Sequence, residues 1–194
     1  MDIANSPIDW TLLSRAIGFY KDLDFKYREL SWFASPEAIK ITLPVYCRTY
    51  DVADHGSLIG SAEQAFLELD TSERLGKGKF IACTPCFRDE KRDLLHQTTF
   101  MKVELYQNID VTEGNLSWMM DIVSTFLRLC LLPYPNAVLR TEQTSVGWDL
   151  TINGVEVGSY GMRQHGALKW LYGTGIAEPR FSLAAKTVDD PALN

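Results

Sequence analysis

Apolar residues recur along the chain at two different periods, and the two periods predict different elements. A stripe at helical spacing predicts an amphipathic helix over residues 10–23, with Asp9 as its N-cap. A second stripe predicts a long helix over residues 116–131, with Asn115 as its cap and Pro133 after its end. The stripes consist of Trp10, Leu13, Ile17 and Tyr20, and of Trp118, Ile122, Phe126 and Leu129. Both are typical of helices that pack against a core.

Shorter apolar runs predict strands and hairpins. Residues 80–82 and 101–106 flank a dense charged loop that begins at Arg88, so they predict two antiparallel strands joined by a polar hairpin. A turn that only solubilises would use Asn, Gly or Asp, whereas this loop carries a guanidinium at its mouth. Arginine suits the planar, two-pronged recognition of phosphate or carboxylate, which makes Arg88 a candidate functional residue.

Three further segments have strand-like patterns. Residues 148–165 predict a strand, a tight turn at residues 153–154 (Asn-Gly) and a second strand. Residues 25–33 suit a strand, and the apolar residues around Pro44 suit a further short strand within residues 38–50.

Length, composition and charge narrow the class of protein. A chain of 194 residues is long enough for one domain with a substantial core, so we expect a single domain over residues 1–194. No apolar run reaches the roughly 18–20 residues that a membrane span needs, and the N-terminus lacks the pattern of a signal peptide. We therefore expect a cytoplasmic protein without a membrane partner. The net charge of −6 argues against broad binding of nucleic acid and leaves a local basic patch open.

Cys83 and Cys86 form a CxxC motif that has three readings. A redox motif requires a helix N-terminus to lower the thiol pKa, but this pair falls on a predicted strand. A structural zinc site requires a second pair of ligands, and the remaining cysteines and histidines are scattered. The motif therefore favours a purely structural role for both cysteines.

Residues 87–90 (FRDE), a loop, His96 and residues 100–104 (FMKVE) closely resemble motif 2 of the class II aminoacyl-tRNA synthetases, and the seryl enzymes come nearest. The helix at 10–23 followed by a strand with Glu-Leu is similar to motif 1, the dimer element, except that the family's proline is replaced by Trp32. Residues 173–180, a glycine-rich run that ends in Arg180, resemble motif 3, a strand that enters a helix.

Residues 148–165 resemble the aspartyl and asparaginyl synthetases. Asp149 and Glu156, seven residues apart, correspond to the pair that helps bind magnesium there, and Arg163 corresponds to an arginine that contacts the amino acid. Carboxylates with phosphate oxygens are ligands that Mg²⁺ prefers, although as single strand residues these two would be ordinary surface groups. Residues 61–63 (Ser-Ala-Glu) are similar to the Thr-Ala-Glu triplet of the seryl and prolyl enzymes. The alternative for Glu63 is a surface residue favoured by a helix dipole.

The resemblance implies an α/β (α+β) fold, in which an antiparallel sheet is flanked by helices as in class II synthetases and biotin ligases. It assigns the α-phosphate of ATP and the substrate carboxylate to Arg88, and the γ-phosphate to Arg180. For ATP the remaining implied ligands are Phe100 for the adenine ring, Glu90 for the adenine amino group, and Gly175. The implied ligands are Glu63, Glu104 and Arg163 for the amino acid, and Asp149 and Glu156 for Mg²⁺.

The activity that this set implies is ATP-dependent activation of an amino acid as an aminoacyl-adenylate, by positioning and electrostatics without a protein nucleophile. The acceptor is left open between the tRNA acceptor stem and a carrier or protein. The length leaves no room for an anticodon-binding domain, and the motif 1 likeness implies a homodimer. The alternative is a non-catalytic synthetase-like regulatory or binding subunit. The joint presence of both arginines, Phe100 and the Asp149–Glu156 pair favours the enzyme.

Overall fold

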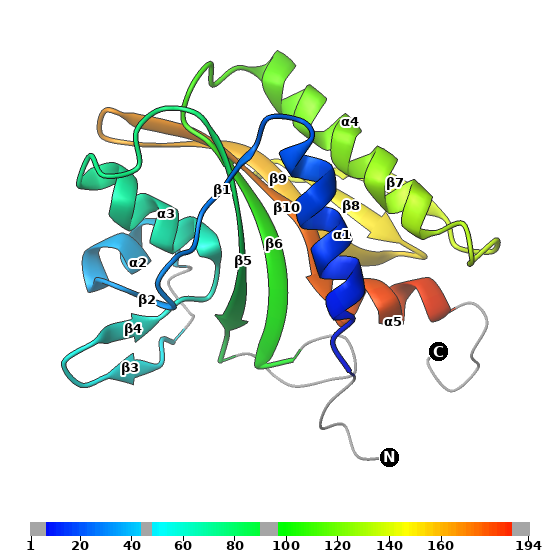
Figure 1. The fold of residues 1–194 in the computed structure, drawn as a ribbon, viewed down its shortest axis with the longest axis horizontal. Coiled ribbons are helices and arrows are strands. Elements are labelled where there is room, and N and C mark those ends of the chain that lie inside the picture. Colours follow the sequence, from blue (N-terminus) through cyan, green and yellow to red (C-terminus); the bar gives the residue numbers. More distant parts are fainter. Residues whose placement is uncertain (1–6, 44–47, 90–96, 188–194) are drawn as a thin grey trace.

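The computed structural model describes residues 7–43, 48–89 and 97–187. Its main element is a seven-stranded sheet in which only the pairing between β1 and β5 is parallel (Figure 1). In spatial order the strands are β1 (Lys26–Tyr27), β5 (Lys79–Phe87), β6 (Thr99–Gln107), β10 (Leu168–Glu178), β9 (Val155–His165), β8 (Trp148–Ile152) and β7 (Leu139–Gln143). The predicted antiparallel sheet flanked by helices is confirmed.

Three helices cover one face of this sheet, and a fourth packs on the other face. The first three are α1 (Trp10–Lys21), α4 (Glu113–Cys130) and α5 (Arg180–Lys186), which share a core with Ile81 and Val103. Helix α3 (Ala62–Thr71) packs with Phe80 and Ala82 on the opposite face (Figure 1). Because side chains alternate along a strand, residues 80–82 of β5 supply both cores.

A small second layer lies beside α3. It consists of helix α2 (Pro36–Thr42) and a three-stranded sheet of β2 (Phe33–Ala34), β4 (Gly56–Leu58) and β3 (Asp51–Val52). Glu68 of α3 ties this layer down, because its carboxylate accepts hydrogen bonds from both the backbone N–H (2.9 Å) and the hydroxyl (2.7 Å) of Ser35. The layer forms one wall of the cleft described below.

The strand predicted over residues 25–33 is wrong in detail, because these residues hold only β1 and the first residue of β2. Of the segment 38–50, in which a short strand was predicted, residues 38–42 belong to helix α2. Helix α2 forms because Ser35 caps its start, Pro36 occupies its first turn, and the charge of Glu37 interacts favourably with the helix dipole. The apolar residues around Pro44 lie largely outside the described residues, so the short strand predicted there stays a prediction.

The two predicted helices are confirmed with small corrections. Asp9 caps α1 through a 2.9 Å hydrogen bond from the Leu12 N–H, and α1 ends two residues before the predicted end. Helix α4 begins at Glu113, because Thr112 rather than Asn115 is its N-cap. Leu129 was predicted for its buried stripe and is 49% exposed instead.

Both predicted hairpins are confirmed. Strands β5 and β6 pair in antiparallel register from Lys79–Gln107 to Phe87–Thr99, although most of the connecting loop, residues 90–96, lies outside the described residues. Asn153 and Gly154 connect β8 to β9 with φ angles of 53° and 81°, as the predicted tight turn requires. Within the described segments, none of the helices has the length and apolar character of a membrane span.

Candidate functional site

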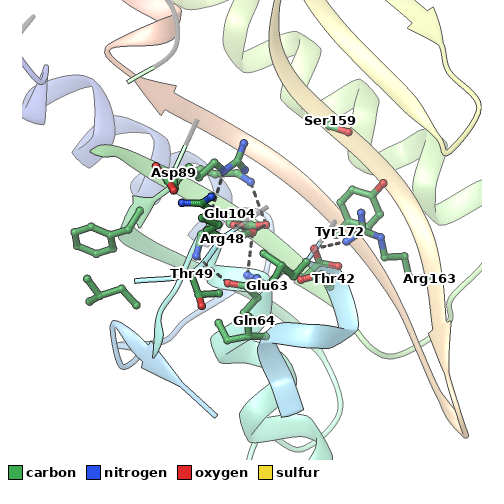
Figure 2. Close-up of a pocket in the computed structure, with 18 of the residues that line it drawn as sticks. Thr42, Arg48, Thr49, Glu63, Gln64, Asp89, Glu104, Ser159, Arg163 and Tyr172 are labelled. Atoms are coloured by element: carbon green, nitrogen blue, oxygen red, sulfur yellow. Dashed lines mark hydrogen bonds and ion pairs between the residues drawn. The ribbon is translucent and has the colours of Figure 1, made fainter. Parts of the chain in front are cut away.

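A cleft of about 740 Å³ opens on the α3 face of the sheet. Its walls come from α2 and α3, from the hairpin of β5 and β6, and from β9 and β10. Arg163 and Tyr172 lie at one end and Asp89 and Arg48 toward the other (Figure 2). The cleft is lined by five of the residues predicted for the site, namely Glu63, Arg88, Glu104, Glu156 and Arg163.

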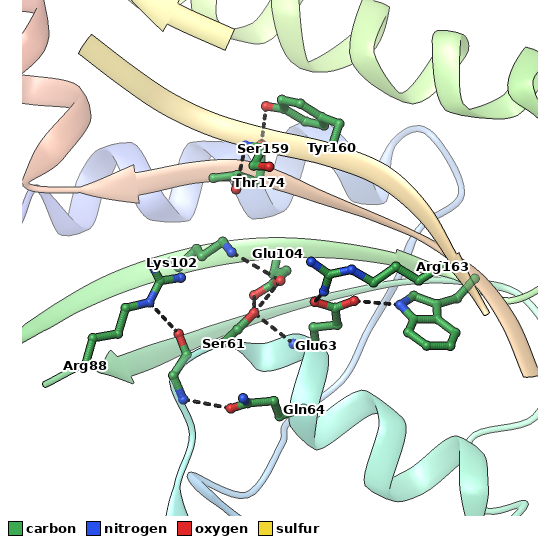
Figure 3. Close-up of polar contacts among 12 residues, drawn as sticks. Ser61, Glu63, Gln64, Arg88, Lys102, Glu104, Ser159, Tyr160, Arg163 and Thr174 are labelled. Carbon is green, nitrogen blue, oxygen red and sulfur yellow. Dashed lines mark hydrogen bonds and ion pairs between the residues drawn. The ribbon is translucent and has the colours of Figure 1, made fainter. Parts of the chain in front are cut away.

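Arg88 follows β5 directly and lies where the hairpin opens. Its Nε donates a hydrogen bond of 3.1 Å to the carbonyl of Gly60, in the turn before α3 (Figure 3). The guanidinium carbon of Arg88 lies 5.2 Å from the centroid of the Phe100 ring. The ring predicted to contact adenine therefore neighbours the arginine predicted to hold the phosphate. Glu90, predicted for the adenine amino group, lies outside the described residues.

Glu104 lies in the middle of the cleft on β6, with a side chain only 1% exposed. Its carboxylate accepts hydrogen bonds from the Ser61 hydroxyl at 2.6 and 2.8 Å and lies 3.1 Å from the Lys102 ammonium (Figure 3). A buried carboxylate is costly unless it is paired, so these contacts explain how Glu104 is accommodated. The prediction assigned no role to Lys102, although its position two residues before Glu104 places it on the same strand face.

Glu63 lies in the first turn of α3 and is 4% exposed. One oxygen accepts a 2.6 Å hydrogen bond from Arg163 and the other a 2.6 Å hydrogen bond from the indole N–H of Trp170. Burial raises the pKa of Glu63, and the Arg163 charge opposes that rise. Residues 63 and 163 were predicted separately for the amino acid, and the structure joins them in one ion pair.

Arg163 is the exposed half of this pair. Its side chain is 36% exposed, and its guanidinium carbon lies 4.1 Å from the centroid of the Tyr172 ring. Stacking on the ring and bonding to Glu63 fix the plane of the guanidinium along the cleft wall. The surface-residue alternative for Glu63 is therefore wrong, because its side chain is buried and bonded.

Asp149 on β8 and Glu156 on β9 belong to neighbouring strands toward the β7 edge of the sheet. Burial raises the pKa of Asp149, the Glu156 charge raises it further, and a hydrogen bond with Ser159 opposes the rise. Glu156 lines the cleft and lies 3.9 Å from the Arg180 guanidinium. This arrangement brings Arg180, predicted for the γ-phosphate, next to the carboxylates predicted for magnesium.

The donor set at this edge fits a magnesium ion only in part. Among the described residues, no group of three or more His, Cys, Asp or Glu side chains could hold a metal. Two carboxylates are nevertheless what Mg²⁺ uses when phosphate oxygens and water complete its shell. Burial and, secondly, the Glu156 charge disfavour the charged form of Asp149, which a cation beside the pair would stabilise.

Gly175 does not line the cleft but faces α1. A Cβ atom there would lie 2.8 Å from a ring carbon of Tyr20, and the Tyr20 hydroxyl donates a 2.8 Å hydrogen bond to the Gly175 carbonyl. The close approach of a tyrosine therefore explains the glycine, rather than the approach of a nucleotide that the resemblance implied. Gly175 belongs to a bulge in the pairing of β10 with β6.

Cys83 and Cys86 are free thiols on β5, and Cys86 is buried. Burial raises the pKa of each thiol to about 11, so neither is a thiolate at neutral pH. A redox-active motif requires the opposite shift. The structural interpretation of this CxxC motif therefore agrees with its surroundings.

Comparison with known proteins finds matches only at the level of structure. No family model matches the sequence, and no curated protein matches it. Two solved structures of pyrrolysyl-tRNA synthetase from Desulfitobacterium hafniense superpose with TM-scores of 0.69 and 0.68, at 17% and 14% sequence identity. Each match covers 89% of this chain and 67% of the synthetase chain.

A seryl-tRNA ligase has the same fold. The cytoplasmic enzyme from Naegleria fowleri, solved in complex with AMP, matches with a TM-score of 0.65 at 18% identity, over 90% of this chain and 46% of its own. All three proteins are class II aminoacyl-tRNA synthetases. The chain therefore has the fold of a class II synthetase catalytic domain, as predicted, and spans less than half the length of the seryl enzyme. At this identity the likeness concerns the fold alone.

Proposed function

We propose that this chain, with its class II synthetase fold, activates an amino acid with ATP to form an aminoacyl-adenylate. The observation that supports the proposal is the convergence of five predicted residues on one cleft, from sequence positions 63 to 163. They carry both signs of charge and come from α3, β6, β9 and the end of β5. A fold alone does not require this set, because unrelated functions share folds.

In the proposed reaction a carboxylate oxygen of the amino acid attacks the α-phosphorus of ATP. An O–P bond forms, the bond to the β-phosphate oxygen breaks, and pyrophosphate leaves with its electron pair. Negative charge grows on the α-phosphate in the transition state, so a preorganised guanidinium accelerates the step. Arg88 takes this role, because its Nε donates to the Gly60 carbonyl, which holds the guanidinium at the mouth of the hairpin, and a guanidinium binds phosphate oxygens through two parallel hydrogen bonds.

The remaining residues bind and orient the substrates. Arg180 binds the γ-phosphate from the start of α5, and Asp149 and Glu156 hold Mg²⁺, which supplies positive charge to the phosphate oxygens when bound. Phe100 offers a ring face to adenine beside Arg88. The ATP contact of Glu90 stays a prediction, and Gly175 is left out of the proposed site because it faces α1.

The end of the cleft near Arg163 and Tyr172 takes the amino acid. Glu63 and Arg163 form one rigid pair there, and Glu104 lies between this pair and Arg88 (Figure 3). In this arrangement the carboxylates attract the substrate ammonium, while Arg163 faces the remainder of the substrate. The acceptor of the activated amino acid is tRNA or a carrier molecule, and the class of acceptor is a separate question from activation.

The test is pyrophosphate exchange into ATP, measured for every amino acid with the purified chain. Exchange with at least one amino acid is expected. Arg88→Lys keeps the charge but loses the planar fork, so it should lower kcat by about 10²–10³-fold and weaken ATP binding much less. An Arg88→Lys protein as fast as the parent would remove the proposed role of Arg88. No exchange with any amino acid and no stabilisation by ATP with Mg²⁺ would favour a non-catalytic subunit.

Assembly into a homodimer is part of the proposal, because motif 1 is the dimer element of the fold. Within the motif 1-like segment two aromatic side chains are exposed, Tyr27 (39%) on the edge strand β1 and Trp32 (53%) shortly after it. Sedimentation at micromolar protein concentration should therefore show a dimer. A strict monomer under these conditions would contradict this part and leave the chemistry untouched.

A further inference from the structure

The Gly60 residue carries two hydrogen bonds that link α3 to Arg88. Its carbonyl accepts the bond from Arg88 Nε at 3.1 Å, and its N–H donates to Gln64 Oε1 at 2.8 Å. The three residues form a continuous chain along one side of the cleft (Figure 3). Gln64 is only 4% exposed, its side chain is uncharged, and it has no part in the resemblance to motif 2.

The α3 end of this chain is rigid. Glu63, next to Gln64, is tied to Arg163 and Trp170, and Phe66 packs in the core beneath α3. The amide of Gln64 therefore extends from an anchored helix. Its hydrogen bond transmits that fixed position to Gly60, because a buried glutamine loses rotamer freedom on forming it and holds one geometry.

The Gly60 end needs such support. A glycine backbone has more accessible conformations than any other residue, and Gly60 lies in the turn before the N-cap of α3. Without the Gln64 acceptor its partly buried N–H would lose its partner, and the turn would depend on the backbone hydrogen bonds that Ile59 makes with Trp32 and Phe87, each 2.9 Å long. A Cβ at this position would lie 3.4 Å from the Phe87 carbonyl and 3.7 Å from Arg88 Cγ, so the Arg88 stem lies directly against the glycine.

We propose that Gln64 is a positioning residue for Arg88, which acts by holding the Gly60 backbone that in turn holds the Arg88 guanidinium. Gln64 lines the cleft, and in this scheme it acts through Gly60 and Arg88 rather than on a substrate. Its effect on catalysis rests on the proposed function, whereas its effect on Arg88 does not. A displacement of about 1 Å at a catalytic group can cost as much as 10²-fold in rate, so even a partial loss of support is measurable.

The first measurement is structural and independent of activity. In protein labelled with ¹⁵N, the Arg88 Nε–H signal is assigned by its absence from Arg88→Lys. Because this N–H is bonded to the Gly60 carbonyl, it should exchange slowly with water in the parent and at least about 10-fold faster in Gln64→Met, which has no acceptor. Gln64→Glu keeps an acceptor oxygen and should retain the slow signal. An unchanged Arg88 signal in Gln64→Met would overturn the proposal.

Matched variants separate this effect from general destabilisation. Gln143→Met makes the same substitution at an exposed glutamine on β7 and should leave the Arg88 signal unchanged. Gln64→Asn keeps the amide but shortens the side chain, so it should behave like Gln64→Met. It serves as the test variant if Gln64→Met does not fold. Accelerated exchange in Gln143→Met as well would show a global effect and also overturn the proposal.

The second measurement is catalytic and uses the amino acid found by pyrophosphate exchange. Gln64→Met should lower kcat by about 10-fold in the parent but by less than roughly 2-fold in the Arg88→Lys background, because a residue that acts through Arg88 loses its effect with it. Equal losses in both backgrounds would contradict the link. If the parent shows no exchange with any amino acid, the proposed function fails, and the Arg88 Nε signal still decides the structural link.

Discussion

Two groups of carboxylates in and beside the cleft differ in how their charges are neutralised. Near α3, Glu63 and Glu104 have side chains 5% and 1% exposed, and each carboxylate is bonded to a cation at 3.1 Å or less and to a further donor. We call this group, with Arg163 and Lys102, the paired cluster. At the opposite edge, Glu156 is 51% exposed and its guanidinium neighbour lies 3.9 Å away. We call Asp149 and Glu156 the acidic edge.

This difference distinguishes two ways of building a polar site. The paired cluster is complete within the protein, since its buried charges are matched and its hydrogen bonds are formed before any substrate arrives. Such preorganisation suits recognition of one substrate in one orientation. At the acidic edge, burial and then the Glu156 charge raise the pKa of Asp149, although Ser159 and Arg180 lie nearby, so an added cation or protonation would stabilise this pair further.

The largest effect should follow from removing a charge from the paired cluster. Glu63→Ala leaves the buried Trp170 N–H without an acceptor and Arg163 without its partner, so we expect a loss of about 2–3 kcal/mol in the free energy of unfolding. The value lies below that of a fully buried pair because Arg163 is partly exposed. Urea unfolding at neutral pH measures it.

The control for this prediction is the same substitution at the acidic edge. Glu156→Ala removes one of two neighbouring carboxylates from an exposed position, so its effect on the free energy of unfolding should be within about 0.5 kcal/mol. Similar losses for Glu63→Ala and Glu156→Ala would show that the paired cluster and the acidic edge do not differ in how their charges are neutralised.

A smaller effect should follow from adding magnesium without a nucleotide. If the acidic edge binds the ion, about 10 mM Mg²⁺ should raise the melting temperature of the parent by roughly 2–4 °C. Asp149→Asn should abolish this shift, whereas Gln143→Met, on the neighbouring strand β7, should retain it. A shift of equal size in parent and Asp149→Asn would place the bound ion elsewhere.

Local sequence signals predicted the fold well where they were redundant. The hairpin of β8 and β9 combines alternating apolar residues with an Asn-Gly turn, and the start of α1 combines a helical stripe with an aspartate cap. Where the prediction relied on apolar residues alone, it missed another signal. Residues 36–42 were not predicted as a helix, although Ser35 and Pro36 mark a helix start. Cap residues therefore deserved more weight than short apolar runs.

The site was predictable by residue type but not by contact. The resemblance named Glu63 and Arg163 without indicating that they bond to each other, because their contact depends on how α3 docks against β9 and β10. For Gly175 the residue type suggested a contact that the structure explains differently. The glycine fitted a nucleotide-binding pattern, but the close packing of Tyr20 from α1 is what excludes a side chain at this position. Gln64 left no signal at all, since a buried glutamine has no motif.

The smallest predicted effect is a pH dependence at the acidic edge. Burial and the Glu156 charge raise the pKa of Asp149 in the folded protein above its unfolded value, so the folded state binds the proton more tightly. The contribution of Asp149 to stability should therefore fall as pH rises through the window between these two values, and stay low at neutral pH. In the absence of Mg²⁺, Asp149→Asn should remove this loss of stability at higher pH.

Urea unfolding of parent and variant across this range tests the sign. Asp149→Asn should gain stability relative to the parent at pH 7 and match it near pH 3.5, below the unfolded pKa of about 3.9, where the parent side chain is also neutral. The gain should stay below about 1 kcal/mol, because Asp149 is partly exposed and water screens its neighbours. Asp121→Asn, on the exposed face of α4, gives the baseline for removing one negative charge from a protein of net charge −6. A variant less stable than the parent at pH 7, once this baseline is subtracted, would mean that Asp149 is satisfied by its own neighbours. The contrast between the acidic edge and the paired cluster would then disappear, and with it the electrostatic reason for a cation at this position.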